Sequence, residues 1–212
     1  AQTPTKFFFE SQPKGRYILI PEVSSEKRIY VPIGFMEPVV ISSNKHYLID
    51  EPSFFVAGLL QSAMHMAWMR AVGGRLESRY QYSASMVYNT FPWPEDVEKS
   101  RVAIENAERA VLAVRSQFAN STLADLYDPL TMPPELRKAH QKLDAAVDKA
   151  YQLCGGKKSY ASDAERVAFL FERYQQLTSL LPPAKAAKAS KPAKATRKAT
   201  AAPGASESTG IA

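Results

Sequence analysis

Hydrophobic and polar residues alternate in short runs over the first fifty positions. Runs rich in Phe, Tyr, Ile and Val predict four strands, at residues 6–10, 16–21, 28–33 and 46–50. Turn-forming residues separate these runs, among them Pro-Lys-Gly at 13–15 and Ser-Ser-Asn at 42–44. We therefore expect a small mixed or antiparallel sheet in this part of the chain.

Residues 53–72 (SFFVAGLLQSAMHMAWMRAV) are too apolar on every side for a surface helix, so we expect one buried helix. A membrane span is an alternative, but Gln61, Ser62 and His65 interrupt the run and its length is marginal. Its methionines and His65 are more typical of core packing than of a cofactor or metal site. The glycine pair at 73–74 ends the helix and allows the chain to turn.

The pattern changes after residues 91–94 (FPWP), where two prolines exclude a helix and disfavour a central strand. Three apolar stripes with alternating spacings of three and four follow, and each predicts an amphipathic helix. The stripes are Val97, Ser100, Ile104, Ala107, Val111, Val114 and Phe118; Leu136, Ala139, Leu143, Ala146, Ala150 and Leu153; and Val167, Leu170, Tyr174, Leu177 and Leu181. We expect these helices to pack antiparallel on one another and against the preceding residues, with their charged faces in solvent.

The net charge of +6 over 212 residues does not describe the part expected to fold. Residues 183–212 hold six Lys and Arg against one Asp or Glu, contain no aromatic residue, and are expected to be disordered. Such a basic arm either attracts phosphates without regard to sequence or merely aids solubility. The chain thus divides into an α+β segment at 1–94, a helical segment at 95–182 and a basic tail at 183–212.

The single cysteine, Cys154, excludes a disulfide within the chain, and three scattered histidines offer no metal-ligand spacing. A reducing, cytoplasmic compartment fits this composition best, and no signal peptide opens the sequence. The chain begins without an initiator Met and runs almost at once into an apolar segment. We therefore expect it to be the C-terminal portion of a longer protein.

Polar groups suited to nucleic-acid contacts gather in residues 73–94, between the buried helix and the prolines. Arg forks onto guanine, Asn onto adenine, and hydroxyls serve either bases or phosphates. The candidate DNA-binding residues are Arg75, Glu77, Ser78, Arg79, Tyr80, Tyr82 and Ser83, with Asn44 and Lys45 in the turn at 42–46 and Arg70 at the end of the buried helix. An ordinary surface loop leading into a strand is the alternative for this stretch.

No catalytic, cofactor-binding or metal-binding residue can be assigned from sequence motifs. The glycine pairs at 73–74 and 155–156 are isolated and do not form a glycine-rich phosphate or adenosine fingerprint. Residues 132–135 (MPPE) lack both flanking groups of the Asp/Asn-Pro-Pro-Tyr/Phe motif. The acidic residues are on helical faces and form no recognisable acid/base pair.

Several long strings of this sequence resemble one family. They are residues 28–35 (RIYVPIGF), 62–78 (SAMHMAWMRAVGGRLES), 80–83 (YQYS), 87–94 (VYNTFPWP), 123–137 (LADLYDPLTMPPELR) and 143–148 (LDAAVD). Together they make residues 15–155 similar to the C-terminal end of the MmeI-like, single-chain type IIL restriction–modification DNA methyltransferases. The tail lies outside this resemblance.

The resemblance implies that residues 1–94 belong to a target-recognition domain and residues 95–155 to the C-terminal helices. Members of the family methylate the exocyclic amino group of adenine with S-adenosylmethionine, which an upstream catalytic domain binds. The implied partners are double-stranded DNA and that upstream methyltransferase domain, with no membrane. Because cofactor and catalytic motifs are absent here, activity cannot be carried over to this chain.

Two further hypotheses remain open at this stage. In one, the striped helices dock a protein partner and the chain is mainly an interaction module. In the other, the lysine-rich tail binds DNA without sequence preference, and the affinity falls steeply with salt.

Overall fold

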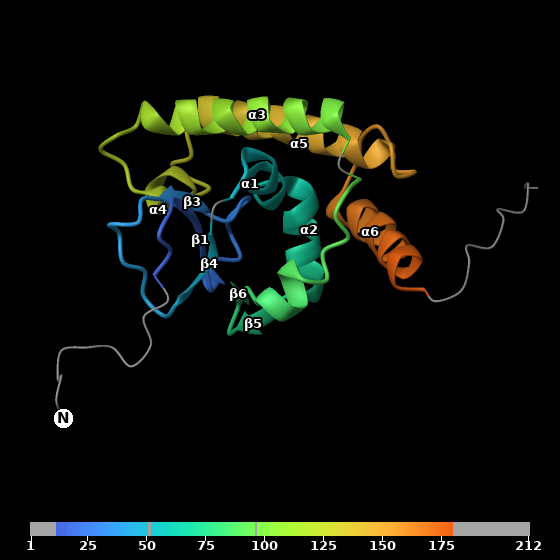
Figure 1. Cartoon of the computed structure of the whole chain (residues 1–212), viewed down its shortest axis with the longest axis horizontal. Coiled ribbons are helices and arrows are strands. Elements are labelled where there is room, and N and C mark those ends of the chain that lie inside the picture. The colour runs from blue at the N-terminus through green and yellow to red at the C-terminus, as the bar shows by residue number, and fades with distance from the viewer. Residues whose placement is uncertain (1–11, 51, 96, 180–212) are drawn as a thin grey trace, which may run out of the picture. The chain divides into compact units, whose positions relative to one another are not determined.

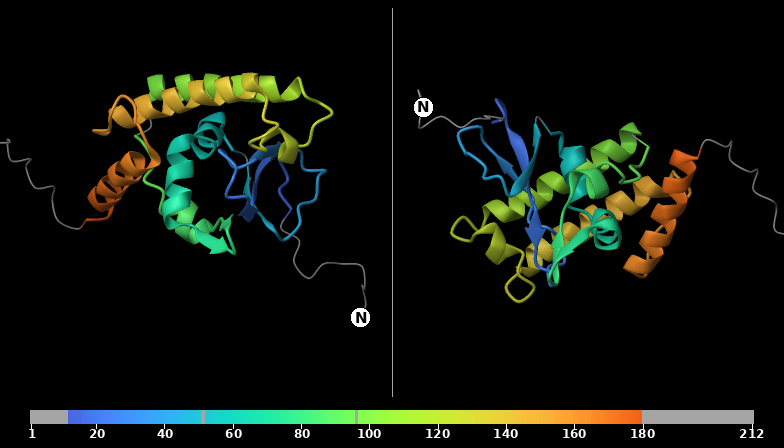
Figure 2. Two further views of the ribbon diagram at one scale, coloured as in Figure 1. Left: turned by 180° about the vertical axis from the view of Figure 1, so that it is seen from behind. Right: turned by 90° about the horizontal axis from the view of Figure 1, so that it is seen from below.

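The computed structural model describes residues 12–50, 52–95 and 97–179, which form an α+β unit (Figures 1 and 2). Residues 17–81 hold the strands of two small sheets and two strongly apolar helices, and a π-helix and four α-helices follow. The strand predicted at 6–10, Leu181 of the third stripe and the basic tail lie outside the described residues.

The first sheet is antiparallel and has the order β3-β1-β4. Its strands are β1 (Tyr17–Pro21), β3 (Gly34–Met36) and β4 (His46–Asp50), with Tyr17 opposite both Met36 and Asp50. The predicted strands at 16–21 and 46–50 are confirmed. Ile18 and Ile20, on the same side of the alternating strand, are buried in the core.

The strand predicted at 28–33 is wrong, because that segment bends at Ile29 and Tyr30 and pairs with no strand, and the strand begins only at Gly34. The carbonyls of Arg28 and Ile29 each accept a 3.1 Å hydrogen bond from the guanidinium of Arg70, and Pro32 has no N–H to donate. The apolar residues of this segment are core residues, as their pattern predicts, since Tyr30, Val31 and Ile33 are buried.

The second sheet is also antiparallel, with the order β2-β6-β5. Its strands are β2 (Val23–Ser24), β5 (Gly74–Leu76) and β6 (Arg79–Gln81). One sheet was expected and there are two, because the chain changes sheets at Glu22. The one-turn π-helix η1 (Ala84–Tyr88) follows β6.

The expected single helix at 53–72 is two helices, α1 (Phe54–Leu60) and α2 (Ala63–Val72). Ser62 accounts for the break, because its hydroxyl accepts from the N–H of His65 and so caps a new helix. Both helices are largely buried, as predicted. None of the helices in the described residues is long and apolar enough to cross a membrane.

Helices α3 (Glu98–Ser116) and α5 (Pro134–Gln152) lie side by side across one end of this unit, antiparallel to each other (Figure 1). The short α4 (Leu123–Leu126) lies in the connection between them. Helix α1 packs on α3 at Gly58, where an added Cβ would be 2.7 Å from Ile104 Cγ2. Glycine at this position is therefore what allows the close approach of the two helices.

The third striped helix, α6 (Asp163–Thr178), packs on α2 instead of joining the α3–α5 pair. The rings of Phe171 and Tyr174 lie 5.0 and 5.9 Å from that of Trp68. We expected the three helices to pack on one another and against the preceding residues, and α6 packs chiefly on the preceding residues while its Arg166 pairs with Asp148 of α5 at 3.3 Å. The apolar stripes pack inside this chain, since they include the fully buried side chains of Ile104, Val111, Leu143 and Leu170.

The expectation that the charged helical faces are solvated fails at Glu108 on α3. This carboxylate is fully buried and accepts a 2.6 Å hydrogen bond from the side chain of Gln61, between α1 and α2. Burial raises the pKa of Glu108 to about 7. Arg115, in the last turn of α3, also donates to Gln61, so a buried polar cluster joins the two halves of the sequence.

Candidate nucleic-acid interface

The segment from Gly74 to Gln81 is a β-hairpin that projects directly from the C-terminal end of α2. Leu76 pairs with Arg79, so Glu77 and Ser78 form a two-residue turn, with Glu77 at a φ of 56°. Every residue from Gly74 to Arg79 is exposed. Strands flank the turn on both sides, where the alternative expected an ordinary surface loop that leads into one strand.

Gly73 sets the direction in which the hairpin leaves the helix. Its φ of −70° suits any residue, but an added Cβ would be 2.5 Å from the carbonyl oxygen of Met69. Only glycine allows the chain to pass so close to the last turn of α2. Since α2 is buried in the core, the hairpin stands on a rigid base.

Both arginines of the hairpin are held by neighbours within the hairpin itself. The guanidinium of Arg75 lies 4.0 Å from the ring centroid of Tyr80 and donates to the carbonyl of Ser78. That of Arg79 donates to the Glu77 carboxylate at 3.0 Å. The Glu77 and Arg79 side chains are 78% and 46% exposed, so this ion pair contributes little to stability. Its effect is to orient both groups at the tip.

Glu22 brings a second loop to the base of the hairpin. Its N–H donates to the carbonyl of Lys45, while its own carbonyl accepts from the N–H of Tyr82 at 2.7 Å. Its carboxylate receives the Gln81 amide at 3.2 Å and lies 3.6 Å from the Lys45 ammonium. Asn44 and Lys45, both exposed, therefore lie at the same edge as β6.

Lys27 is a further exposed cation near this edge. It is in the turn after β2, and β2 pairs with β6 through Ser24 and Tyr80. The sequence alone does not show which strand lies beside Lys27. Glu22 was missed altogether, because pairing between distant segments leaves no local signal.

Four of the predicted residues serve the fold in this structure. Tyr82 is buried, its hydroxyl lies 3.0 Å from Nε2 of His65, and burial raises its pKa. Tyr80 lies beneath Arg75 and is also buried. Ser83 caps η1 by accepting from the N–H of Met86. Arg70 forms an ion pair with Asp163 of α6 and bonds two backbone carbonyls, so it is not part of the hairpin surface.

His65 is a core histidine, as its sequence context suggested. It is fully buried, and burial lowers its pKa to about 3, so the imidazole is neutral. Its edge packs against the Phe91 ring at a centroid distance of 4.6 Å. Among the described residues Nδ1 has no hydrogen-bond partner, which leaves Tyr82 as the only polar contact of the ring.

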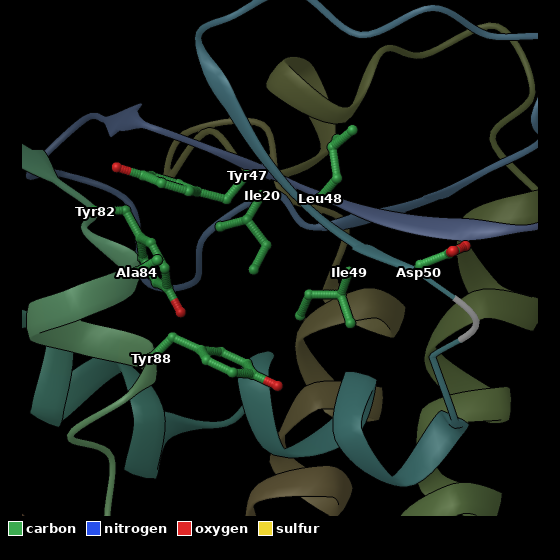
Figure 3. A pocket seen from close by; sticks show the side chains of 8 residues that line it. All are labelled: Ile20, Tyr47, Leu48, Ile49, Asp50, Tyr82, Ala84 and Tyr88. Carbon is green, nitrogen blue, oxygen red and sulfur yellow. The ribbon is translucent and has the colours of Figure 1, made fainter. Parts of the chain in front are cut away.

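A cavity of about 330 Å³ opens beside the base of the hairpin, between β4 and η1 (Figure 3). The rings of Tyr47, Tyr82 and Tyr88 line it together with the side chains of Ile20 and Ile49. The lining is mainly apolar and carries no cation from the described residues, so it does not suit a phosphate.

Comparisons with known proteins agree with this architecture. The family model of the MmeI target recognition domain matches residues 1–95, and that of the MmeI C-terminal domain matches residues 96–182. DNA methyltransferase A of Bacillus subtilis (strain 168) is 43% identical over 178 residues, which are 84% of this chain and 20% of that protein.

A solved structure of the Type IIL restriction-modification enzyme MmeI in complex with DNA is also similar. It is 57% identical, superimposes with a TM-score of 0.79, and matches 84% of this chain and 23% of its own. The chain thus spans about a fifth to a quarter of the length of these relatives. It belongs to the MmeI family, of which it represents the target recognition domain followed by the C-terminal domain.

Proposed function

We propose that this chain is the DNA-sequence reader of a longer adenine-specific DNA methyltransferase of a restriction–modification system. The observation that carries the proposal is the exposed hairpin, with Arg79 and Glu77 oriented at its tip and Gly73 fixing it to a buried helix. The similarity to a protein whose structure contains DNA supports the choice of ligand. The division at 94/95 into reader and C-terminal helices is part of this proposal.

Arg79 and Glu77 would read base edges in the major groove. A guanidinium donates two hydrogen bonds to guanine, and a carboxylate accepts from the amino group of cytosine. Phosphates would repel a carboxylate as exposed as that of Glu77, so a base edge suits it better than the backbone. The ion pair keeps the two side chains next to each other, so that they would contact acceptors and donors on adjacent bases.

The remaining surface residues would position the duplex. We assign Asn44 to an adenine edge, because its amide can donate and accept at once, and Lys45 to phosphate. Arg75 is turned along the hairpin over Tyr80 and is within reach of phosphate or guanine, and Ser78 offers a hydroxyl at the tip. We omit Tyr82 from the proposed contacts because its hydroxyl contacts His65 in the core, and Arg70 because it pairs with Asp163 of α6.

S-adenosylmethionine is implied for the parent enzyme, but the described residues do not fit it. Gly73 and Gly74 follow a helix instead of preceding one, and the tyrosine-lined cavity offers no glycine-rich turn. We therefore derive no methyl-transfer step from this chain, and assign the cofactor and the chemistry to the upstream part of the polypeptide. The free thiol of Cys154 fits the reducing compartment of the cytoplasm.

The proposal can be tested in the full-length polypeptide that contains this chain. Arg79→Ala should lower discrimination at one position of the target by about tenfold, because one bidentate base contact is worth about 1–3 kcal/mol. The matched control is Arg109→Ala, which removes the exposed member of the Arg109–Glu105 pair of 3.2 Å on α3. Sequencing of methylated sites should show relaxed specificity for Arg79→Ala alone. Identical site preferences in both variants would exclude Arg79 as a reader.

A further inference from the structure

The β3–β4 loop, residues 37–45, displays an apolar tip made of Val39, Val40 and Ile41. These side chains are 83%, 43% and 78% exposed, and the loop is drawn in light blue at the edge of Figure 1. Burial of three consecutive exposed aliphatic side chains would lower the free energy, because it removes their apolar surface from water. Nothing in the candidate DNA surface uses them.

The apolar tip is held in place by buried and partly buried side chains. The hydroxyl of Tyr17, a fully buried residue, donates a 2.6 Å hydrogen bond to the carbonyl of Val40. The Gln12 amide donates to the carbonyls of Pro38 and Val40 at 3.1 and 2.8 Å. A turn from Glu37 to Val40 completes the support. These hydrogen bonds hold the backbone of the tip at Glu37, Pro38 and Val40.

The apolar tip and the proposed DNA-facing edge have different anchors. Tyr17, which bonds the tip, begins β1, whereas Glu22, which bonds Lys45 and Tyr82, follows the last residue of β1, Pro21. Ile41 lies three residues before Asn44 in the same loop. In residues 37–41 the one charged side chain is Glu37, whose carboxylate lies 3.8 Å from the guanidinium of Arg16.

We propose that the apolar tip docks against the upstream domain of the same polypeptide. The chain spans about a fifth to a quarter of the length of its relatives, so the proposed function, on which this inference rests, tethers a large upstream surface to it. Gln12, the first residue that the structure describes, bonds the tip directly. A complementary apolar surface on that domain would bury Val39 and Ile41 and fix the angle between catalytic domain and reader.

Site-specific crosslinking in the full-length polypeptide tests the docking. A photoreactive benzophenone side chain replaces Ile41, or in the matched control Leu130, which is 94% exposed in the turn before α5. After irradiation, the probe at 41 should join peptides upstream of this chain, with and without DNA, and more often than the probe at 130. Crosslinks from 41 to DNA, or none above the control, would overturn the proposal.

A second measurement does not depend on the bulky probe. Val39→Ser combined with Ile41→Ser should increase the rate of protease cleavage between the upstream domain and this chain by about tenfold, as loss of about 1.4 kcal/mol of docking energy would. Leu130→Ser should leave that rate unchanged, and equal rates for both would contradict the docking. The methylated sequence should stay the same in either case, which keeps this test separate from that of Arg79.

Discussion

The phenol of Tyr30 donates a 2.6 Å hydrogen bond to the carboxylate of Asp144, which is 114 residues further along the chain. The second oxygen of Asp144 accepts the N–H of Ala63, the first residue of α2, at 2.6 Å. Asp144 on α5 thus joins the helical segment to the buried helix that carries the hairpin. Burial raises the pKa of Asp144 to about 6, because it disfavours the charged carboxylate. The hydrogen bonds from Tyr30 and Ala63 favour the charged form, so the junction depends on these two donors.

Tyr30→Phe should destabilise the chain by about 1–3 kcal/mol, because the partly buried carboxylate of Asp144 loses a donor. The measurement is urea-induced unfolding of the 212-residue chain. The control is Tyr88→Phe, since no hydrogen bond to the Tyr88 hydroxyl occurs among the described residues. Equal unfolding midpoints for both variants would contradict the role of Tyr30.

Glu108 should make stability depend on pH. Its pKa is about 7 in the folded chain, against 4.5 for a glutamate that is free in water, so the folded form binds a proton more tightly. Its contribution is complete below pH 4.5 and is lost as the pH rises to 7, by at most about 3 kcal/mol.

The comparison of wild type with Glu108→Gln isolates this effect. Burial also lowers the pKa values of His65 and His140 to about 3, which acts in the opposite direction over pH 3 to 6.5 in both proteins. The wild-type free energy of unfolding should fall relative to that of the variant between about pH 5 and 7. A constant difference over this range would show that Glu108 does not titrate there.

Gly73→Ala should displace the hairpin while Gly74→Ala should not. An added Cβ meets the Met69 carbonyl at 2.5 Å in the first case and nothing closer than 3.5 Å in the second. Such a clash costs about 1–3 kcal/mol or forces the backbone to move. Gly73→Ala should therefore unfold at lower urea than Gly74→Ala, and in the full-length polypeptide only Gly73→Ala should reduce target selectivity. The account fails if the two variants behave alike.

Arg70→Lys should loosen α6 from α2. The guanidinium bonds Asp163 and the carbonyls of Arg28 and Ile29 at once, and a single ammonium cannot reach all three. We expect a loss of about 1–2 kcal/mol after allowance for solvent, because the Arg70 side chain is partly exposed. Asp163→Asn should cost less, since both carbonyls keep their donor. Urea unfolding of the two variants compares them, and the reverse order would contradict this assignment.

The parts of the fold that follow local patterns were predictable from the sequence. The alternation at 16–21 and 46–50 gave the correct strands, and the 3,4 stripes gave helices α3, α5 and α6. Burial of residues 53–72 followed from their composition. The break at Ser62 was not expected, although serine is a preferred helix cap, because the apolar run continues on both sides of it.

The parts that depend on distant pairing were not predictable. Residues 28–33 are as apolar as a strand, but the carbonyls of Arg28 and Ile29 accept hydrogen bonds from Arg70 and not from a neighbouring strand. Arg70 reaches them only in the folded chain. Tyr82 and Arg79 look alike as candidate readers in sequence, yet the hydroxyl of Tyr82 reaches His65 in the core whereas Arg79 stays at the tip. The link through Glu22 depends on three separate segments.

The most direct test of the central claim is a base-by-base map of the sites that the full-length polypeptide methylates when Glu77 is changed to Lys. Reversal of charge at the hairpin tip should change the preferred base pair at one target position, while the affinity for S-adenosylmethionine stays unchanged. Glu105→Lys on α3 is the control, because it reverses a charge that pairs with Arg101 and Arg109 within one helix and not in the hairpin. An unaltered target sequence for Glu77→Lys, at unaltered relative rates, would contradict the assignment of the hairpin as the DNA reader.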